Sequence, residues 1–152
     1  MDVHYGPLPE VPTEQLLEVL NDARIARHMP LWGEFSPEGV REWALAKAAL
    51  DVPEGLGPQA VYVDGRFAGW AGIQPEDFGP DFAVVLAPWA WGAGGLVAEQ
   101  LLARAAAAGL TEVFIALPPT RHADRVVGRL GFTRVADDVD GFIVYRRILA
   151  SA

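Results

Sequence analysis

Residues 82–97 decide the fold, and they read Phe82-Ala83-Val84-Val85-Leu86-Ala87-Pro88-Trp89-Ala90-Trp91-Gly92-Ala93-Gly94-Gly95-Leu96-Val97. The apolar run of six at the start predicts a strand, which Pro88 closes because proline has no N–H to donate to a neighbouring strand. Three glycines then occur within four positions, and they predict a bend where a ligand can come close to bare backbone amides. A helix from Leu96 to Ala108 is expected next, with Gly109 as its C′ residue.

The glycine bend and the start of the following helix together predict an anion site. The first N–H groups of a helix have no intrahelical partner and lie at the positive end of its dipole, an arrangement that holds phosphate above all. The alternative is a tight strand-to-helix connection without a ligand. Each glycine costs about 0.5–1 kcal/mol relative to alanine at such a position, so three of them favour a requirement of the backbone.

Length and composition predict one globular domain, residues 1–152, because 51% of the residues are hydrophobic and 21% are charged. Cysteine is absent, which excludes disulfides, thiolate metal sites and a cysteine nucleophile and suits a reducing compartment. The N-terminus has no signal-like pattern, and no apolar run is long enough to cross a bilayer, so we expect a cytoplasmic protein. The three histidines lack ligand spacing, and no metal is expected.

The net charge of −8 argues against nucleic acid or an anionic membrane as the main partner. The charge is uneven, because residues 1–81 carry 14 acidic and 5 basic side chains and residues 82–152 carry 6 and 7. A cationic substrate would be favoured near the acidic half, although a solvated acidic surface explains the same charges.

The rest of the chain predicts an order of strands and helices. Strands are expected at Val3–Leu8, Gln59–Val63, Arg66–Ile73, Asp81–Ala87, Glu112–Leu117, Phe132–Ala136 and Phe142–Ile148, and helices from Thr13 to near His28, from Ser36 to Leu50, over Leu96–Ala108 and after Thr120. Asp64-Gly65 predicts a tight hairpin, and residues 74–80 are expected to form a turn. The strands on either side of the central helix must be parallel.

This order, together with two motifs, resembles the GNAT superfamily of acyl-CoA-dependent N-acetyltransferases. The family loop (Gln or Arg)-x-x-Gly-x-(Gly or Ala) is matched by residues 91–96, where Gly94 is a strict match and Trp91 and Leu96 depart from the pattern. The second motif, Arg129-Leu130-Gly131-Phe132, is similar to the family's Lys-Leu-Gly-Phe. The Trp-Gly-x-Gly bend resembles the one that occurs in the branch of the family containing ribosomal-protein alanine acetyltransferases. The resemblance implies an α/β (α+β) domain with a mixed sheet of about six to seven strands, a V-shaped opening between strands 4 and 5, and about four flanking helices.

The resemblance also implies acetyl-CoA or another acyl-CoA as co-substrate. In the family the pantetheine arm pairs with amides of the fourth strand, and the pyrophosphate lies on the following loop. The corresponding residues here are Val84, Val85 and Leu86 for pantetheine, and Trp91, Gly92, Ala93, Gly94, Gly95, Leu96 and Val97 for pyrophosphate, with Thr120 where many members have asparagine.

The chemistry that the resemblance implies is direct attack of a primary amine on the thioester. Asp81, Glu76 and Asp77 are the candidate bases, and the amide near Leu86 is the candidate oxyanion donor. Val127 replaces the family's frequent tyrosine acid, which leaves Tyr145, Tyr62, His122 or a water to protonate the thiolate. The acceptor, a small-molecule amine or a protein N-terminus, is expected against Trp32, Phe35 and Trp70.

Two other functions compete with this prediction, and Val127 and Thr120 motivate the first of them, a non-catalytic acyl-CoA-binding or regulatory module of the same fold. The second is a methyltransferase or nucleotide-binding α/β domain. A dinucleotide fingerprint fails at Val97, and a P-loop lacks its Gly-Lys-Ser/Thr. Formation of a homodimer is left open.

Overall fold

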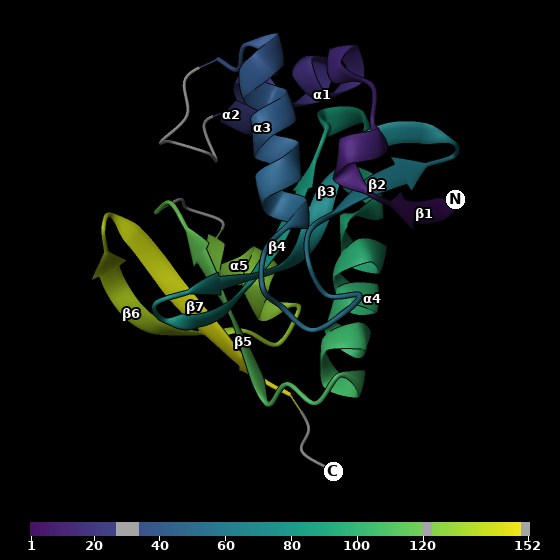
Figure 1. Cartoon of the computed structure of the whole chain (residues 1–152). Helices are drawn as coiled ribbons and strands as arrows, with labels where there is room; N and C mark the ends of the chain where they lie inside the picture. The colour runs from purple at the N-terminus through teal and green to yellow at the C-terminus, as the bar shows by residue number, and fades with distance from the viewer. Residues whose placement is uncertain (27–33, 120–122, 150–152) are drawn as a thin grey trace.

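The computed structural model describes residues 1–26, 34–119 and 123–149, and Figure 1 shows its backbone. The strands in this part of the chain are β1 (Val3–Gly6), β2 (Gln59–Val63), β3 (Arg66–Glu76), β4 (Gly79–Leu86), β5 (Glu112–Leu117), β6 (Thr133–Val139) and β7 (Phe142–Ile148). They form one mixed sheet in the order β1-β2-β3-β4-β5-β7-β6. The pair β4 and β5 is parallel, as predicted, and the other neighbours are antiparallel.

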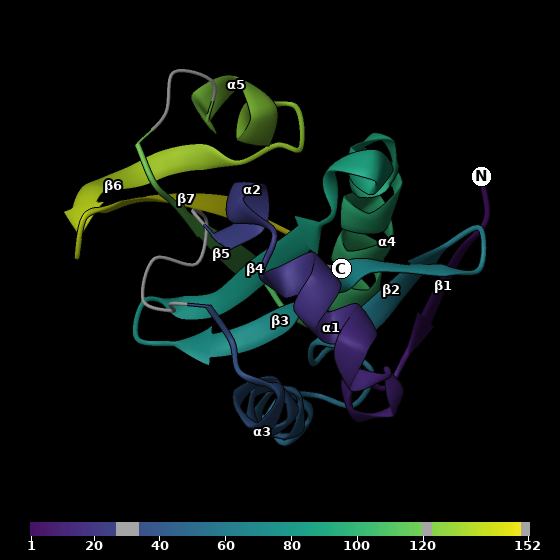
Figure 2. The same ribbon diagram turned by 90° about the horizontal axis from the view of Figure 1, so that it is seen from above.

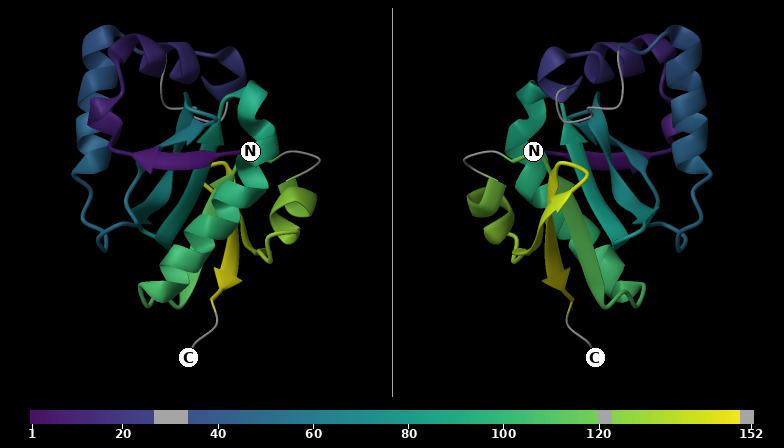
Figure 3. Two further views of the ribbon diagram at one scale, coloured as in Figure 1. Left: turned by 90° about the vertical axis from the view of Figure 1, so that its right-hand side faces the viewer. Right: turned by 90° about the vertical axis from the view of Figure 1, so that its left-hand side faces the viewer.

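Helices cover both faces of the sheet. They are α1 (Thr13–Leu20), α2 (Ala23–Ala26), α3 (Pro37–Ala48), α4 (Gly94–Ala107) and α5 (Ala123–Gly128), with 3₁₀ turns η1 (Leu8–Glu10) and η2 (Pro88–Ala93). Figure 2 and Figure 3 show α3 and α4 on opposite sides of the sheet. Each face has its own apolar core, one around Leu101 of α4 and Phe82, the other around Trp43 of α3 and Trp70.

Local sequence signals explain where most elements begin and end. The Oγ of Ser36 accepts a hydrogen bond from the Gly39 N–H at 2.9 Å, which is the predicted N-cap of α3. Asp64 and Gly65 have φ of 51° and 81°, so the tight β2–β3 turn is confirmed. The single helix predicted from Thr13 to near His28 is interrupted, because α1 ends at Leu20 and a short α2 begins at Ala23; its predicted end lies outside the described residues.

The turn predicted over residues 74–80 is present but shorter, because β3 extends to Glu76 and β4 begins at Gly79, which leaves residues 77 and 78 as the turn. Pro75 and Pro80 face each other in this ladder. The Ala87 N–H donates to the Ala68 carbonyl at 2.7 Å, and counting alternate pairs from there makes the proline pair a non-hydrogen-bonded one. The missing N–H groups of the two prolines therefore remove no hydrogen bond from the ladder, and the hairpin continues through both residues.

The parallel contact between β4 and β5 is limited to one register pair, Asp81 opposite Phe114. Beyond Asp81, β4 continues for five residues to Leu86 without a further pair to β5 in the ladder. The two strands therefore diverge toward their carboxyl ends. This is the V-shaped opening that the sequence predicted between the fourth and fifth strands.

Candidate active site

A cavity of about 460 Å³ occupies the opening between β4 and β5. Its walls come from eight elements, α2, α3, β3, β4, η2, α4, β5 and β7, and from Pro118 next to β5. The lining residues are Arg24 and Ile25 of α2, Lys47 of α3, Trp70 and Gln74 of β3, residues 81–86 of β4, Trp91, Gly94, residues 115–118 and Phe142. The cavity thus joins the strand predicted to hold a pantetheine to the helices on the other side of the sheet.

Backbone register decides which β4 amides face this cavity. Because the Ala87 N–H bonds to β3, the backbone groups of Val85 also point to β3, opposite Trp70. Those of Val84 and Leu86 point to the other edge, where no strand pairs with them. Of the three amides predicted for pantetheine, two therefore face the opening, and the Val85 prediction conflicts with this register.

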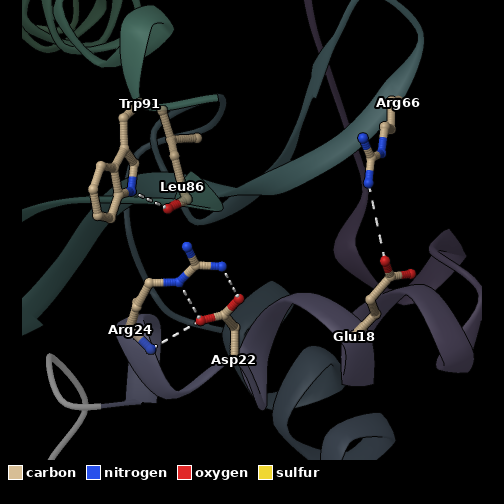
Figure 4. A network of polar contacts seen from close by, with 6 residues as sticks. All are labelled: Glu18, Asp22, Arg24, Arg66, Leu86 and Trp91. Atoms are coloured by element: carbon tan, nitrogen blue, oxygen red, sulfur yellow. Dashed lines mark hydrogen bonds and ion pairs between the residues drawn. The ribbon is translucent and has the colours of Figure 1, made fainter. Parts of the chain in front are cut away.

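The side chain of Trp91 contacts this open edge. Its Nε1 donates a hydrogen bond to the Leu86 carbonyl at 2.9 Å, as Figure 4 shows, while 58% of the residue stays exposed. A carbonyl oxygen has two lone pairs, so Leu86 keeps capacity for a second donor. Trp91 therefore narrows the mouth of the cavity without closing the strand edge.

The glycine bend is open, but for a different reason than predicted. None of Gly92, Gly94 and Gly95 has a positive φ. A Cβ at Gly92 or Gly95 would meet nothing within 4 Å, and no side chain caps the start of α4 at Gly94. Absence of side chains, and not unusual backbone, leaves the start of α4 open to an anion. The Gly94 N–H already donates to the Trp91 carbonyl, so the candidate amides begin at Gly95.

The other residues predicted for the bend differ in how far their side chains are buried. Leu96 is 39% exposed, whereas Ala93 and Val97 lie in the core below α4. Ala93 and Val97 can therefore offer a ligand only their backbone. Thr120 lies outside the described residues.

A chain of hydrogen bonds crosses the floor of the cavity on the α3 side. Lys47 Nζ donates to Gln74 Oε1, and Gln74 Nε2 donates to Asp81 Oδ2 at 3.1 Å. An ammonium can only donate, so it fixes which way the Gln74 amide faces. The NH₂ end of Gln74 then points to Asp81, where it stabilises the ionised carboxylate.

Burial raises the pKa of Asp81 to about 7. The Gln74 hydrogen bond, the Lys47 charge and the Ala116 backbone N–H act in the opposite direction, while the Glu76 carboxylate adds to the increase. Burial also lowers the pKa of Lys47, although Asp81 and Glu76 oppose that effect. Asp81 is thus a carboxyl group that can accept and release a proton near neutral pH.

Of the remaining predicted site residues that the structure describes, Trp70 lines the cavity, whereas Glu76, Tyr145 and Phe35 do not. Glu76 is exposed near the tip of the β3–β4 hairpin, and Tyr145 is 1% exposed in the core below α4. Phe35 packs edge-on against Trp43 at 6.0 Å between ring centroids, and Trp70 does line the cavity. Trp32 lies outside the described residues. Within the described chain no group of His, Asp and Glu side chains could hold a metal ion.

Sequence reasoning missed three polar residues of the cavity: Arg24, Lys47 and Gln74. Lys47 carried a signal that could have been used, because it is the only lysine in the chain. Gln74 was assigned to a turn, which hid its place opposite Asp81. Arg24 is held by Asp22 through two hydrogen bonds of 3.1 and 3.0 Å, drawn in Figure 4.

Comparison with known proteins identifies the fold. No protein-family model and no curated protein sequence matches the chain. Among solved structures, the acetyltransferase of GNAT family from Streptococcus pneumoniae has 15% identity and a TM-score of 0.69, with 98% of this chain and 99% of that chain covered. The ribosomal-protein-alanine N-acetyltransferase from Brucella melitensis has 16% identity and a TM-score of 0.70, covering 98% and 100%.

A third similar structure contains a ligand. The Salmonella typhimurium protein yncA, solved with its cofactor acetyl-CoA, has 17% identity and a TM-score of 0.71, covering 100% of this chain and 95% of that chain. At such identities the likeness establishes the architecture. The chain has the GNAT fold, as its sequence predicted.

Proposed function

We propose that this protein transfers an acyl group from acyl-CoA, with acetyl-CoA as the expected donor, to a primary amine. The observation that carries the proposal is the combination of features in one cavity: an unpaired β4 edge, an open helix start next to it, and Asp81 with a pKa of about 7. Neighbours with this fold include acetyltransferases, and one was solved with acetyl-CoA. The GNAT fold supports acetyl transfer in general, and the cavity supports the roles below.

The residues present fit an acyl-CoA. Backbone groups of Val84 and Leu86 face the opening and can pair with the amides of a pantetheine arm. The first N–H groups of α4 can hold the pyrophosphate, at about 0.3–1 kcal/mol for each favourable contact with the helix end. The co-substrate supplies the activated thioester.

Strand geometry refines the predicted oxyanion donor. Successive residues of a strand rise by about 3.3 Å, so Leu86 lies about 17 Å along β4 from Asp81, and Val84 about 10 Å. One tetrahedral centre cannot contact both Asp81 and Leu86. We therefore assign the oxyanion contact to the Val84 N–H, while Asp81 takes the proton of the amine directly or through one water.

The non-catalytic module remains the second candidate, because no tyrosine, histidine or cysteine is among the described residues that line the cavity. No side chain there matches the family's frequent proton donor. The thiol of coenzyme A is acidic enough to leave as thiolate, so acyl transfer remains the first candidate function. We place the reaction in the cytoplasm on the composition, and no helix of the described chain is long and apolar enough to span a membrane.

Two measurements test the proposal. Thermal unfolding is followed with acetyl-CoA, S-adenosylmethionine and NADH, and only acetyl-CoA should raise Tm. Release of free thiol is then recorded with a panel of small-molecule amines and peptides with free N-termini. No stabilisation by any CoA species would exclude both the enzyme and the module. Binding without thiol release over the whole panel would favour the module.

A charge placed at the start of α4 should separate cofactor binding from folding. In Gly95→Glu the new side chain meets no atom near its Cβ, and a carboxylate in the first turn suits the helix dipole. It would repel the pyrophosphate, so the Kd for acetyl-CoA should rise about 10-fold or more with Tm unchanged. Isothermal titration with Gly95→Gln as neutral control checks this, and equal affinities of the two variants would place the pyrophosphate elsewhere.

A further inference from the structure

The α3 side of the cavity contains Lys47, whose hydrogen-bonding capacity is not filled, and Trp70, whose Nε1 is buried from solvent. Lys47 has three N–H donors, and Gln74 Oε1 is its one hydrogen-bond acceptor among the described residues. No described carboxylate lies within 4 Å of its Nζ. The Nε1 of Trp70, a residue that is 4% exposed, is buried without a hydrogen-bond partner in the described chain. Both residues line the cavity.

These two side chains lie close together. Lys47 Nζ is 5.1 Å from the centre of the Trp70 ring, and it also contacts Gln74. In the β3–β4 ladder, Gly72 is opposite Ala83. This pair lies between two others, Trp70 opposite Val85 and Gln74 opposite Asp81. The backbone of Gly57 and Pro58 covers Gly72, since a Cβ added there would lie 2.4 Å from the Pro58 Cα, whereas the small Ala83 lines the cavity.

The same place carries opposite charges at a short separation. Lys47 and Asp81 bind the two ends of one carboxamide, that of Gln74. Arg24, the other cation of the described lining, is already paired with the Asp22 carboxylate through two hydrogen bonds. Glu76 also acts on Asp81 but is exposed, so solvent screens it. Lys47 is therefore the cation that an incoming anion would meet, one amide away from the candidate base.

We propose that the acceptor is a free α-amino acid, with its amine at Asp81 and its carboxylate accepting hydrogen bonds from Lys47 Nζ. This inference rests on the proposed acyl transfer and narrows its acceptor. In the reaction a C–N bond forms between the amine and the acyl carbon, the C–S bond of the thioester breaks, Asp81 receives a proton from the amine, and coenzyme A leaves as thiolate.

The carboxylate is what separates this acceptor from the alternatives. A protein N-terminus has a neutral peptide carbonyl at the same position, and a simple amine has no acceptor group there. Charge-assisted hydrogen bonds in a partly buried site are about twice as strong as neutral ones. The unfilled donors of Lys47 therefore favour the free acid.

Leucine and leucinamide form a matched pair of acceptors for the test. We expect kcat/KM at least about 10-fold higher for leucine, although leucinamide has the less basic amine and so more of its neutral form at pH 7.5. Lys47→Met should lower kcat/KM for leucine about 10- to 100-fold more than that for leucinamide, because both substrates share the effect of the substitution on Asp81 and only leucine loses the contact to its carboxylate. Lys47→Arg, which keeps the charge, should recover part of the preference.

Thermal unfolding of each variant checks that the protein is folded. Equal use of leucine and leucinamide would overturn the inference. So would an equal loss for both substrates in Lys47→Met, since Lys47 would then act only on Asp81.

Binding separates this inference from the proposed function. Titration of the wild-type protein with leucine in the presence of coenzyme A should give a Kd that rises about 10-fold or more in Lys47→Met. Lys47-dependent binding of leucine without any transfer would contradict the acyltransferase and leave the acceptor site standing. Transfer to leucinamide and leucine at the same rate would support the acyltransferase and contradict the proposed acceptor site.

Discussion

Asp81→Asn should lower kcat for acyl transfer by about 10²- to 10⁴-fold, the usual contribution of a positioned general base. Asparagine has nearly the same size and can still accept the Gln74 hydrogen bond, which measures 3.1 Å at Oδ2. It cannot take a proton from the amine. Steady-state kinetics with acetyl-CoA and an active amine measure the loss, and the Kd for acetyl-CoA should stay within about 3-fold because Asp81 lies beyond the proposed cofactor contacts.

The pH dependence supports the same assignment. Asp81 acts as a base only when ionised, so kcat/KM should rise with pH through about 7. Glu76→Gln is the matched control, because Glu76 is exposed and does not line the cavity. It should keep activity within about 3-fold and shift the acid limb slightly to lower pH. An Asp81→Asn variant that retains a tenth or more of wild-type kcat would contradict the assignment.

Asp81 should also make stability depend on pH. Its native pKa of about 7 exceeds the ordinary value of 3.8, so the native state holds the proton more tightly than the unfolded state. The stability from this protonated group is fully present below pH 3.8 and is lost as pH rises through 7. Urea unfolding should therefore show Asp81→Asn gaining stability relative to wild type between pH 5 and pH 8.

Gly69→Ala should destabilise the fold by about 3–5 kcal/mol, a magnitude seen when backbone strain and a clash combine. Gly69 has φ of +151°, which side-chain-bearing residues rarely adopt, and an added Cβ would lie 2.0 Å from the Val85 carbonyl oxygen. That oxygen belongs to β4, which is paired with β3 along eight residues and cannot move away alone. Tm should fall by about 10 °C.

Gly128→Ala is the control for this substitution. A Cβ at Gly128 would meet nothing within 4 Å, and its φ is not positive. Its effect should stay within about 0.5 kcal/mol. A Gly69→Ala variant with Tm within 2 °C of wild type would show that β3 and β4 can separate locally at this point.

Much of the fold follows from local signals in the sequence. The apolar run before Pro88, the Asp64-Gly65 turn and the Ser36 cap each specify one element, and the helix between two strands requires the parallel pair β4 and β5. The opening beside β4 was predicted from the family resemblance. The strand, the turn and the helix cap depend on short stretches of chain, so the sequence alone predicts them.

The polar site was harder to predict because it is assembled from distant parts of the chain. Lys47, Gln74 and Asp81 come from a helix and two strands, and only the β3–β4 register brings the latter two together. The prolines at 75 and 80 suggested a turn, which moved Gln74 out of the sheet. The pKa of Asp81 depends mainly on burial, a tertiary property that the acidic sequence around it does not reveal.

The single pair that joins β4 to β5 has a mechanical consequence. It divides the sheet into a four-stranded and a three-stranded wing that share a pivot at Asp81 and Phe114. Rotation of one wing against the other about this pivot displaces each β4 residue in proportion to its distance from Asp81. Leu86 and the glycine bend would therefore move furthest, and the carboxyl group of Asp81, at the pivot, would move least. Rocking of the wings would widen the mouth for a cofactor while the candidate base keeps its place.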